Sequence, residues 1–173
     1  MRSHRDLSFA VHQAWARLRG WVSDLEDEEY FWEPAPGAFA IRRRDDGLWK
    51  YGYAIPDPQP APPRTIGWLV VHLASCKEMY WEYAYGPAQR TWDQVFAPPQ
   101  AASALTWLEH AQELVESALR NETNLERPVL TNWGDTWPAW KVFWTLAEHD
   151  LMHGAEISAL RDLRRAQVPQ TTA

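Results

Sequence analysis

Cysteine is almost absent from this sequence of 173 residues, which contains Cys76 alone. A single cysteine excludes a framework of internal disulfides and is typical of proteins in a reducing cytoplasm. Long apolar runs are also missing. The sequence contains no stretch of about 20 apolar residues, which is the length that spans a bilayer. It also has no apolar run near the N-terminus that would predict a secretory signal. We therefore expect a cytoplasmic protein that has no membrane partner.

Basic residues are fewer than acidic ones: the sequence contains 17 Lys and Arg and 23 Asp and Glu, which gives a formal net charge of −6. Binding to nucleic-acid phosphates needs a basic face. The one basic run, Arg42 to Arg44, is typical of a solvated loop, so nucleic acid is not an expected partner.

Tryptophan, in contrast, is abundant, with 12 residues. These residues build a Trp-rich core and rim, or several of them line an aromatic pocket.

The chain has no internal repeat and its length suits a single domain over residues 1–173. Apolar residues recur at spacings of three and four in four segments, which predicts amphipathic helices. We expect these helices at residues 7–31, 65–85, 101–120 and 138–165. Thr65 is the expected N-cap of the second helix and Pro138 suits the first turn of the fourth.

Long connections separate the predicted helices. Residues 33–64 contain "DDG" between aromatic and aliphatic residues, which predicts a short hairpin, followed by a stiff Pro-rich spacer. Residues 166–173 are expected to form a mobile tail. Four amphipathic helices bury their apolar stripes best against each other, and long connections favour crossovers over a simple up-down-up-down order. The predicted fold class is therefore all-α, a four-helix bundle with long crossover connections.

Histidines interrupt the apolar stripe of the fourth predicted helix. His149 and His153 are four residues apart, so both rings lie in the middle of the core-facing side. Burial of two imidazoles is costly unless they find partners. Residues at i and i+4 can bind one cation from the same helix face. Two hydrogen-bonded core histidines are the alternative interpretation of the same spacing.

A third interior histidine, His72, lies on the core side of the second predicted helix. If the second and fourth helices are neighbours, three imidazoles meet around one ion. Three neutral nitrogen donors suit zinc or nickel and leave a coordination position for water or substrate. Cys76 is a further candidate ligand, although a small buried apolar role is common for cysteine. Glu156 and His12 are candidates for proton transfer or for supporting a ligand.

Two segments carry a resemblance to a known family: "RTIGWLVVHLASCKEMYWEY" and "WTLAEHDLMHGAEISALRDL". With the opening "WARLRGWVSDLEDEEYFWEPAPG" and the region "FAIRRRDDGLWKY", they make the chain similar to the DinB/YfiT-like superfamily of metal-binding four-helix bundles. The resemblance implies an up-down-down-up bundle, often dimeric, in which three histidines hold a divalent metal. The implied ligands are His72, His149 and His153. Met152 departs from the pattern, because relatives often carry a second adjacent histidine there.

Some characterised members of that superfamily are S-transferases or isomerases that use low-molecular-weight thiols such as mycothiol or bacillithiol. The resemblance therefore implies a metal-dependent enzyme, with a thiol-dependent S-transferase acting on small electrophiles as the leading hypothesis. A metal-dependent hydrolase is the second hypothesis, with Glu156 or His12 assisting. The third is not enzymatic: a stress-related binding bundle that contains a structural metal. If the loop of residues 33–64 folds over the site, Arg42, Arg43 or Arg44 can meet a substrate carboxylate.

Overall fold

The computed structural model describes residues 3–52 and 58–167 of the chain. They form a mostly helical fold, in agreement with the predicted class, and also contain two small strand pairs. The four long helices are α1 (His4–Val22), α3 (Ile66–Ala84), α4 (Ala101–Asn121) and α5 (Ala139–Gln167). Each begins and ends within a few residues of its predicted position, except at the C-terminal end of the first.

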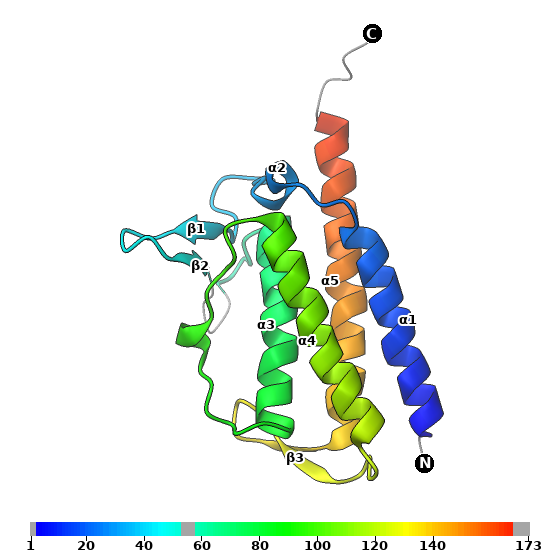
Figure 1. Ribbon diagram of the computed structural model, residues 1–173. Coiled ribbons are helices and arrows are strands. Elements are labelled where there is room, and N and C mark those ends of the chain that lie inside the picture. The colour runs from blue at the N-terminus through cyan, green and yellow to red at the C-terminus, as the bar shows by residue number, and fades with distance from the viewer. Residues whose placement is uncertain (1–2, 53–57, 168–173) are drawn as a thin grey trace.

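The long helices lie side by side (Figure 1). α1 and α5 run in one direction, and α3 and α4 run in the other. α5 packs against both α1 and α3, and α3 packs in turn against α4. The helices that carry the histidine motifs are therefore neighbours, although 77 residues separate His72 from His149. No helix among the described residues is long and apolar enough to cross a membrane.

Helix caps and apolar stripes explain these elements. The hydroxyl of Ser3 accepts a hydrogen bond from the amide of Asp6, and that of Thr65 accepts one from the amide of Trp68, so both helix starts are satisfied. α1 buries a single stripe of Leu7, Val11, Ala14, Leu18 and Val22. α3, in contrast, is buried on nearly all sides over its first three turns. It is the central helix of the fold.

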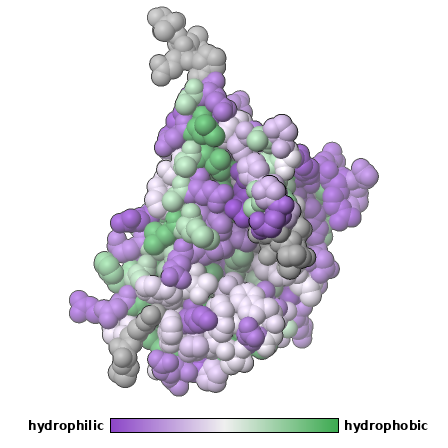
Figure 2. Space-filling model, turned by 180° about the vertical axis from the view of Figure 1, so that it is seen from behind, coloured by the Kyte–Doolittle hydropathy of each residue, from purple (hydrophilic) through white to green (hydrophobic). Residues whose placement is uncertain are grey.

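Between α1 and α5 the surface is hollowed and apolar. A groove of about 470 Å³ is lined by residues that include Phe9, Trp144 and Leu151, which are 66%, 38% and 39% exposed. Figure 2 shows hydrophobic side chains gathered in a stripe that descends from the C-terminal end of the described part of α5. Large apolar patches on a monomer often mark an interaction surface.

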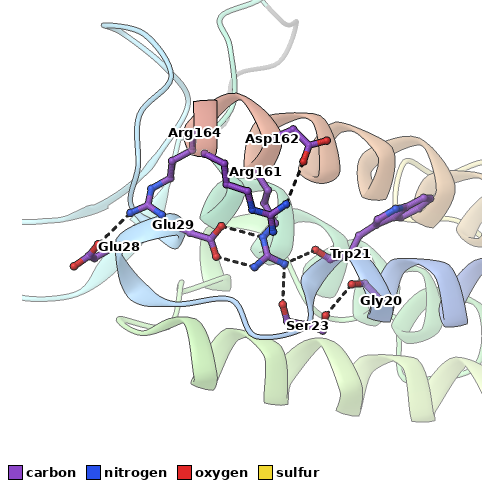
Figure 3. Close-up of polar contacts among 9 residues, drawn as sticks. Gly20, Trp21, Ser23, Glu28, Glu29, Arg161, Asp162 and Arg164 are labelled. Atoms are coloured by element: carbon purple, nitrogen blue, oxygen red, sulfur yellow. Dashed lines mark hydrogen bonds and ion pairs between the residues drawn. The ribbon is translucent and has the colours of Figure 1, made fainter. Parts of the chain in front are cut away.

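The prediction of one continuous helix over residues 7–31 is wrong. α1 ends at Val22, and a short helix, α2 (Asp27–Tyr30), follows after a turn. Arg161 of α5 lies at this break, and its guanidinium donates hydrogen bonds to the carbonyls of Trp21 and Ser23 and two more to the carboxylate of Glu29 (Figure 3). Carbonyls left free by the end of α1 are thus satisfied by a distant side chain.

Two hairpins occupy the connections. In the predicted one, β1 (Ile41–Arg43) pairs antiparallel with β2 (Trp49–Tyr51), and Gly47 adopts a φ of 83° in the turn. A second hairpin, β3 (Pro128–Leu130) with β4 (Thr136–Pro138), was not predicted. Pro138 therefore ends β4 rather than starting α5. The amides of Ala139 and Trp140 donate to the carbonyls of Arg127 and Leu125, so backbone groups replace the expected cap. Residues 168–173 of the predicted tail lie outside the described residues, whereas 166 and 167 are helical.

A polar group is buried where α3, α4 and α5 meet. The Lys77 ammonium donates to Asp150 Oδ2 at 2.7 Å and to Gln112 Oε1 at 2.8 Å. The side chains of Lys77 and Asp150 are only 1% and 2% exposed. Burial raises the pKa of Asp150, and the neighbouring ammonium opposes that rise. We refer to Lys77, Asp150 and Gln112 as the buried polar triad.

At Gly154, side chains of α1 lie very close to the backbone of α5. A Cβ at this position would lie 2.3 Å from Cε3 of Trp21 and 3.3 Å from Cδ1 of Leu18. The missing side chain therefore lets an indole ring lie directly against the backbone of α5. Gly154 directly follows His153, so this contact fixes α5 against α1 at the level of the histidine motif.

Candidate metal centre

Three imidazoles meet between α3 and α5. His72 projects from α3, and His149 and His153 project from successive turns of α5. The ring centroid of His72 lies 4.9 Å from that of His149 and 5.1 Å from that of His153. The centroids of the two α5 rings are 4.5 Å apart. His72 and His153 are buried and His149 is half-buried. The structure thus brings together the three histidines singled out from the sequence.

The spacing of two ring nitrogens suits a shared cation. Nε2 of His72 lies 3.1 Å from Nε2 of His149. Two nitrogen ligands at about 2.0–2.1 Å from one ion, roughly 90–110° apart, are separated by about 2.9–3.4 Å. The same distance also permits a hydrogen bond between one protonated and one unprotonated nitrogen. The geometry is therefore compatible with joint ligation without requiring it.

His153 has a second contact that is typical of metal-binding histidines. Its Nδ1 lies 3.1 Å from Oε2 of Glu156, one turn further along α5. An imidazole that donates one N–H to a carboxylate keeps the other nitrogen as an acceptor, which fixes the tautomer needed for ligation. Nε2 of His153 is then the nitrogen available to the cluster. The supporting role considered for Glu156 matches this position.

Two residues that the sequence did not single out complete the surroundings. The ring of Trp68 stacks on that of His72, with centroids 4.6 Å apart and planes 20° apart. The guanidinium of Arg64 lies over Trp68 at 5.3 Å, and its Nη1 is 3.6 Å from Oε1 of Glu156. Arg64 therefore contacts both Trp68, which stacks on His72, and Glu156, which contacts His153. The side chain of Arg64 is about a quarter exposed, so it lies at the rim.

Cys76 lies beside the imidazoles, one turn after His72 on α3. Its Sγ is 3.8 Å from both ring nitrogens of His72. His72, Cys76 and His149 each offer a ligand atom, and these three atoms lie within 4.8 Å of one another. Burial raises the pKa of the Cys76 thiol to about 12, although the charge of Lys77 opposes the rise. The thiol is therefore protonated in the metal-free protein.

A family model for the DinB superfamily matches residues 10–157. The chain belongs to the DinB superfamily. The match covers α3 and α4 completely and most of α1 and α5, and it includes all three clustered histidines. No curated protein and no solved structure gives a significant match to the chain.

Burial favours the neutral forms of His72 and His149 in this DinB superfamily member. Burial, followed by the neighbouring imidazoles, lowers the pKa of His149 to about 3 and holds that of His72 well below its ordinary value. Burial alone would raise the pKa of Glu156, but the hydrogen bond with His153 and the charge of Arg64 outweigh it and lower the pKa. Neutral His72 and His149 and an ionised Glu156 are in the protonation states that metal binding needs.

Other candidates lie elsewhere in the DinB fold. His12 is half exposed on α1, where its Nδ1 is 2.6 Å from the carbonyl of Ser8 and its Nε2 is 4.0 Å from Glu116 of α4. It makes no contact with the cluster among those that the structure records. Met152, where the resemblance predicted a departure from the family pattern, is 59% exposed. A side chain at this position faces solvent rather than the histidine cluster.

The basic run of residues 42–44 also has partners of its own. Arg42 forms two hydrogen bonds with Glu33, and Arg44 pairs with Asp46 at 3.0 Å. Arg43 reaches the carbonyl of Gly47. Arg64 is instead the arginine that the described residues place beside the histidines.

The donor set fits the divalent metal that the superfamily implies. Three imidazoles, one of them supported by a carboxylate, and a nearby thiol are ligands that zinc and nickel accept readily. Asp150 Oδ1, which follows His149 in the sequence, has no hydrogen-bond partner among the described residues and belongs to the buried polar triad rather than to the cluster. The His–Cys–His group is therefore compatible with metal binding.

Proposed function

We propose that this DinB superfamily protein binds a divalent metal ion, zinc or nickel, through His72, His149 and His153. The observation that carries the proposal is the convergence of the three rings, with centroids 4.5–5.1 Å apart, from two separate helices. The carboxylate of Glu156 behind His153 supports it, because such partners are typical of ligating histidines. Three histidines leave one tetrahedral position for a substrate atom.

The helix directions support the finer description of the fold. α1 and α5 run opposite to α3 and α4, which is the up-down-down-up order of a four-helix bundle with crossovers. This order makes α3 and α5 antiparallel neighbours. Their i and i+4 pairs can then face each other at one depth.

The proposed activity is thiol-dependent S-transfer to small electrophiles. A divalent ion in the cluster would act as a Lewis acid that lowers the pKa of a bound thiol. In the overall reaction the thiol sulfur forms a bond to the electrophilic carbon, the leaving group departs with its electron pair, and the thiol proton passes to solvent. In this scheme Glu156 orients His153 and does not contact the substrate. Arg64, at the rim, provides a positive charge that can bind an anionic thiol or substrate.

The experiment is a matrix of thiols and metals. Protein purified without an affinity tag is stripped with a chelator, reloaded with zinc or nickel, and assayed with a chlorodinitrobenzene electrophile and a panel of low-molecular-weight thiols, including mycothiol and bacillithiol. The expected result is a rate that needs both metal and thiol and is lost in His149→Ala. His110→Ala is the matched control, because His110 is an exposed histidine on α4. No metal-dependent rate above background with any thiol would refute the S-transferase.

A parallel assay with ester and amide substrates covers the hydrolase alternative, since hydrolysis needs no thiol. A bundle that loses its fold in His149→Ala, with no activity in either assay, would indicate a structural metal instead.

We also propose that the protein is a homodimer, as many superfamily members are, and that the apolar groove between α1 and α5 is the interface. Phe9, Trp144 and Leu151 would be covered there by the same surface of a second copy. A two-fold interface of this kind uses one patch twice.

A further inference from the structure

Two pairs of candidate ligands face each other across the α3–α5 boundary. On α5 the pair is His149 and His153, and on α3 it is His72 and Cys76, both with a spacing of four residues. Residues so spaced on a helix have Cβ atoms about 5–6 Å apart, so both members of each pair can reach one ion. The centre is thus built from two matched pairs rather than from three histidines alone.

The sulfur distances agree with a role in ligation. A thiolate sulfur at about 2.3 Å from an ion and an imidazole nitrogen at about 2.0–2.1 Å, roughly 100–120° apart, are separated by about 3.3–3.8 Å. Sγ of Cys76 is 3.8 Å from Nε2 of His72, at the upper end of that range. Its separation from the ligand atom of His149 is no more than 4.8 Å, so a side-chain adjustment of about 1 Å brings all three within range.

The setting of Cys76 also favours a partner that sulfur can bind strongly. The side chain is buried, and the hydrogen-bond partner that the structure records for it is the His72 ring, 3.8 Å away. A thiol is a weak donor and a weak acceptor, so this contact contributes little by itself. As a metal ligand the same atom is among the strongest donors for zinc.

We propose that Cys76 Sγ is a ligand of the metal ion, which makes the resting centre a four-ligand site of three imidazole nitrogens and one thiolate. The proposal rests on the proposed metal binding by the histidines and deepens it. A thiolate selects zinc, and other ions that accept sulfur, over magnesium, calcium and manganese. It also sets a condition for catalysis: a substrate has to add to a four-coordinate ion as a fifth ligand.

Cobalt(II) is the probe, because cobalt–thiolate bonds give a strong charge-transfer band in the near ultraviolet. The metal-free full-length protein is titrated with cobalt chloride in a non-thiol reductant. Since the chain contains one cysteine, any such band arises from Cys76. The expected result is a band that saturates at one equivalent of cobalt and is absent in Cys76→Ser and Cys76→Ala. His110→Ala, the exposed histidine variant, keeps it.

Zinc affinity gives a second readout. Cys76→Ala is expected to weaken zinc binding by more than the roughly 10–100-fold that loss of an outer-shell partner costs, with the helical circular dichroism unchanged. X-ray absorption of the wild-type zinc protein, which needs no variant, is expected to show one sulfur at about 2.3 Å.

The failures are separable. Cobalt or zinc that binds at one equivalent without a thiolate band or a sulfur neighbour would overturn the role of Cys76 and leave metal binding by the histidines intact. A protein that binds neither ion would overturn the proposed function, and the role of Cys76 with it.

Discussion

Replacing Lys77 by Met tests whether the buried polar triad is as desolvated as its geometry indicates. The side chains of Lys77 and Asp150 are 1% and 2% exposed and their charged atoms are 2.7 Å apart. Removing one partner of a buried pair typically costs about 3–5 kcal/mol, because the other charge stays buried without compensation. We expect a loss near the lower end of that range, since a carboxyl whose pKa is raised by burial can take up a proton.

That protonation gives the variant a distinctive pH dependence. Without Lys77, the pKa of Asp150 in the folded protein rises further above its unfolded value of about 3.9. A carboxyl with a raised folded-state pKa contributes stability that is fully present below the unfolded pKa and is lost as the pH rises through the folded pKa. The deficit of Lys77→Met relative to the wild type is therefore expected to shrink as the pH falls from 7 towards 4.

The assay is urea unfolding of the metal-free protein, followed by tryptophan fluorescence at several pH values. The double variant Lys77→Met with Asp150→Leu removes both charges and is expected to lose less than the single variant. Asp162→Asn on α5 is the control, because Asp162 and its partner Arg165 are exposed, and a change within about 0.5 kcal/mol is expected. A Lys77→Met deficit below about 1 kcal/mol at neutral pH, or one that does not depend on pH, would refute the reasoning.

Three further predictions concern α5 and its neighbours. Arg161→Met removes two hydrogen bonds to Glu29 and two to backbone carbonyls, so urea unfolding should show a free energy of unfolding lower by about 3–5 kcal/mol. The control Arg164→Met should have a much smaller effect. Equal effects of the two substitutions would contradict the role of Arg161. Glu156→Gln should weaken zinc binding about 10–100-fold in calorimetry with no loss of fold, and an unchanged affinity would argue against ligation by the histidine it supports. Phe9→Glu should convert a dimer to a monomer in analytical ultracentrifugation; a wild-type protein that is already monomeric would remove the basis for the interface.

Local patterns in the sequence predicted the helices and the histidine faces well. Thr65 caps α3 as expected, because an N-cap depends on residues within one turn. The i and i+4 pair on α5 and the interior position of His72 followed from helical periodicity. Their convergence required α3 and α5 to be neighbours, which periodicity does not determine.

Long-range polar contacts were the features that the sequence did not predict. The carbonyls at the break after Val22 bind Arg161, which lies 140 residues from Trp21 in the sequence. The burial of Lys77 depends on Asp150, 73 residues away, and nothing in the local pattern of a lysine indicates such a partner. Arg64 was missed for a related reason: it precedes the predicted helix, and only the fold brings it to Glu156.

The packing at Gly154 leads to a prediction for amide hydrogen exchange in α5. A glycine inside a helix ordinarily weakens it by about 0.5–1 kcal/mol and lets water reach the backbone. Here the indole of Trp21 covers the peptide groups next to His153, since no Cβ keeps the ring away. The amide hydrogens of this turn should therefore be among the slowest in the chain to exchange with deuterium. From its glycine alone, the same turn would be expected to exchange faster than the rest of α5.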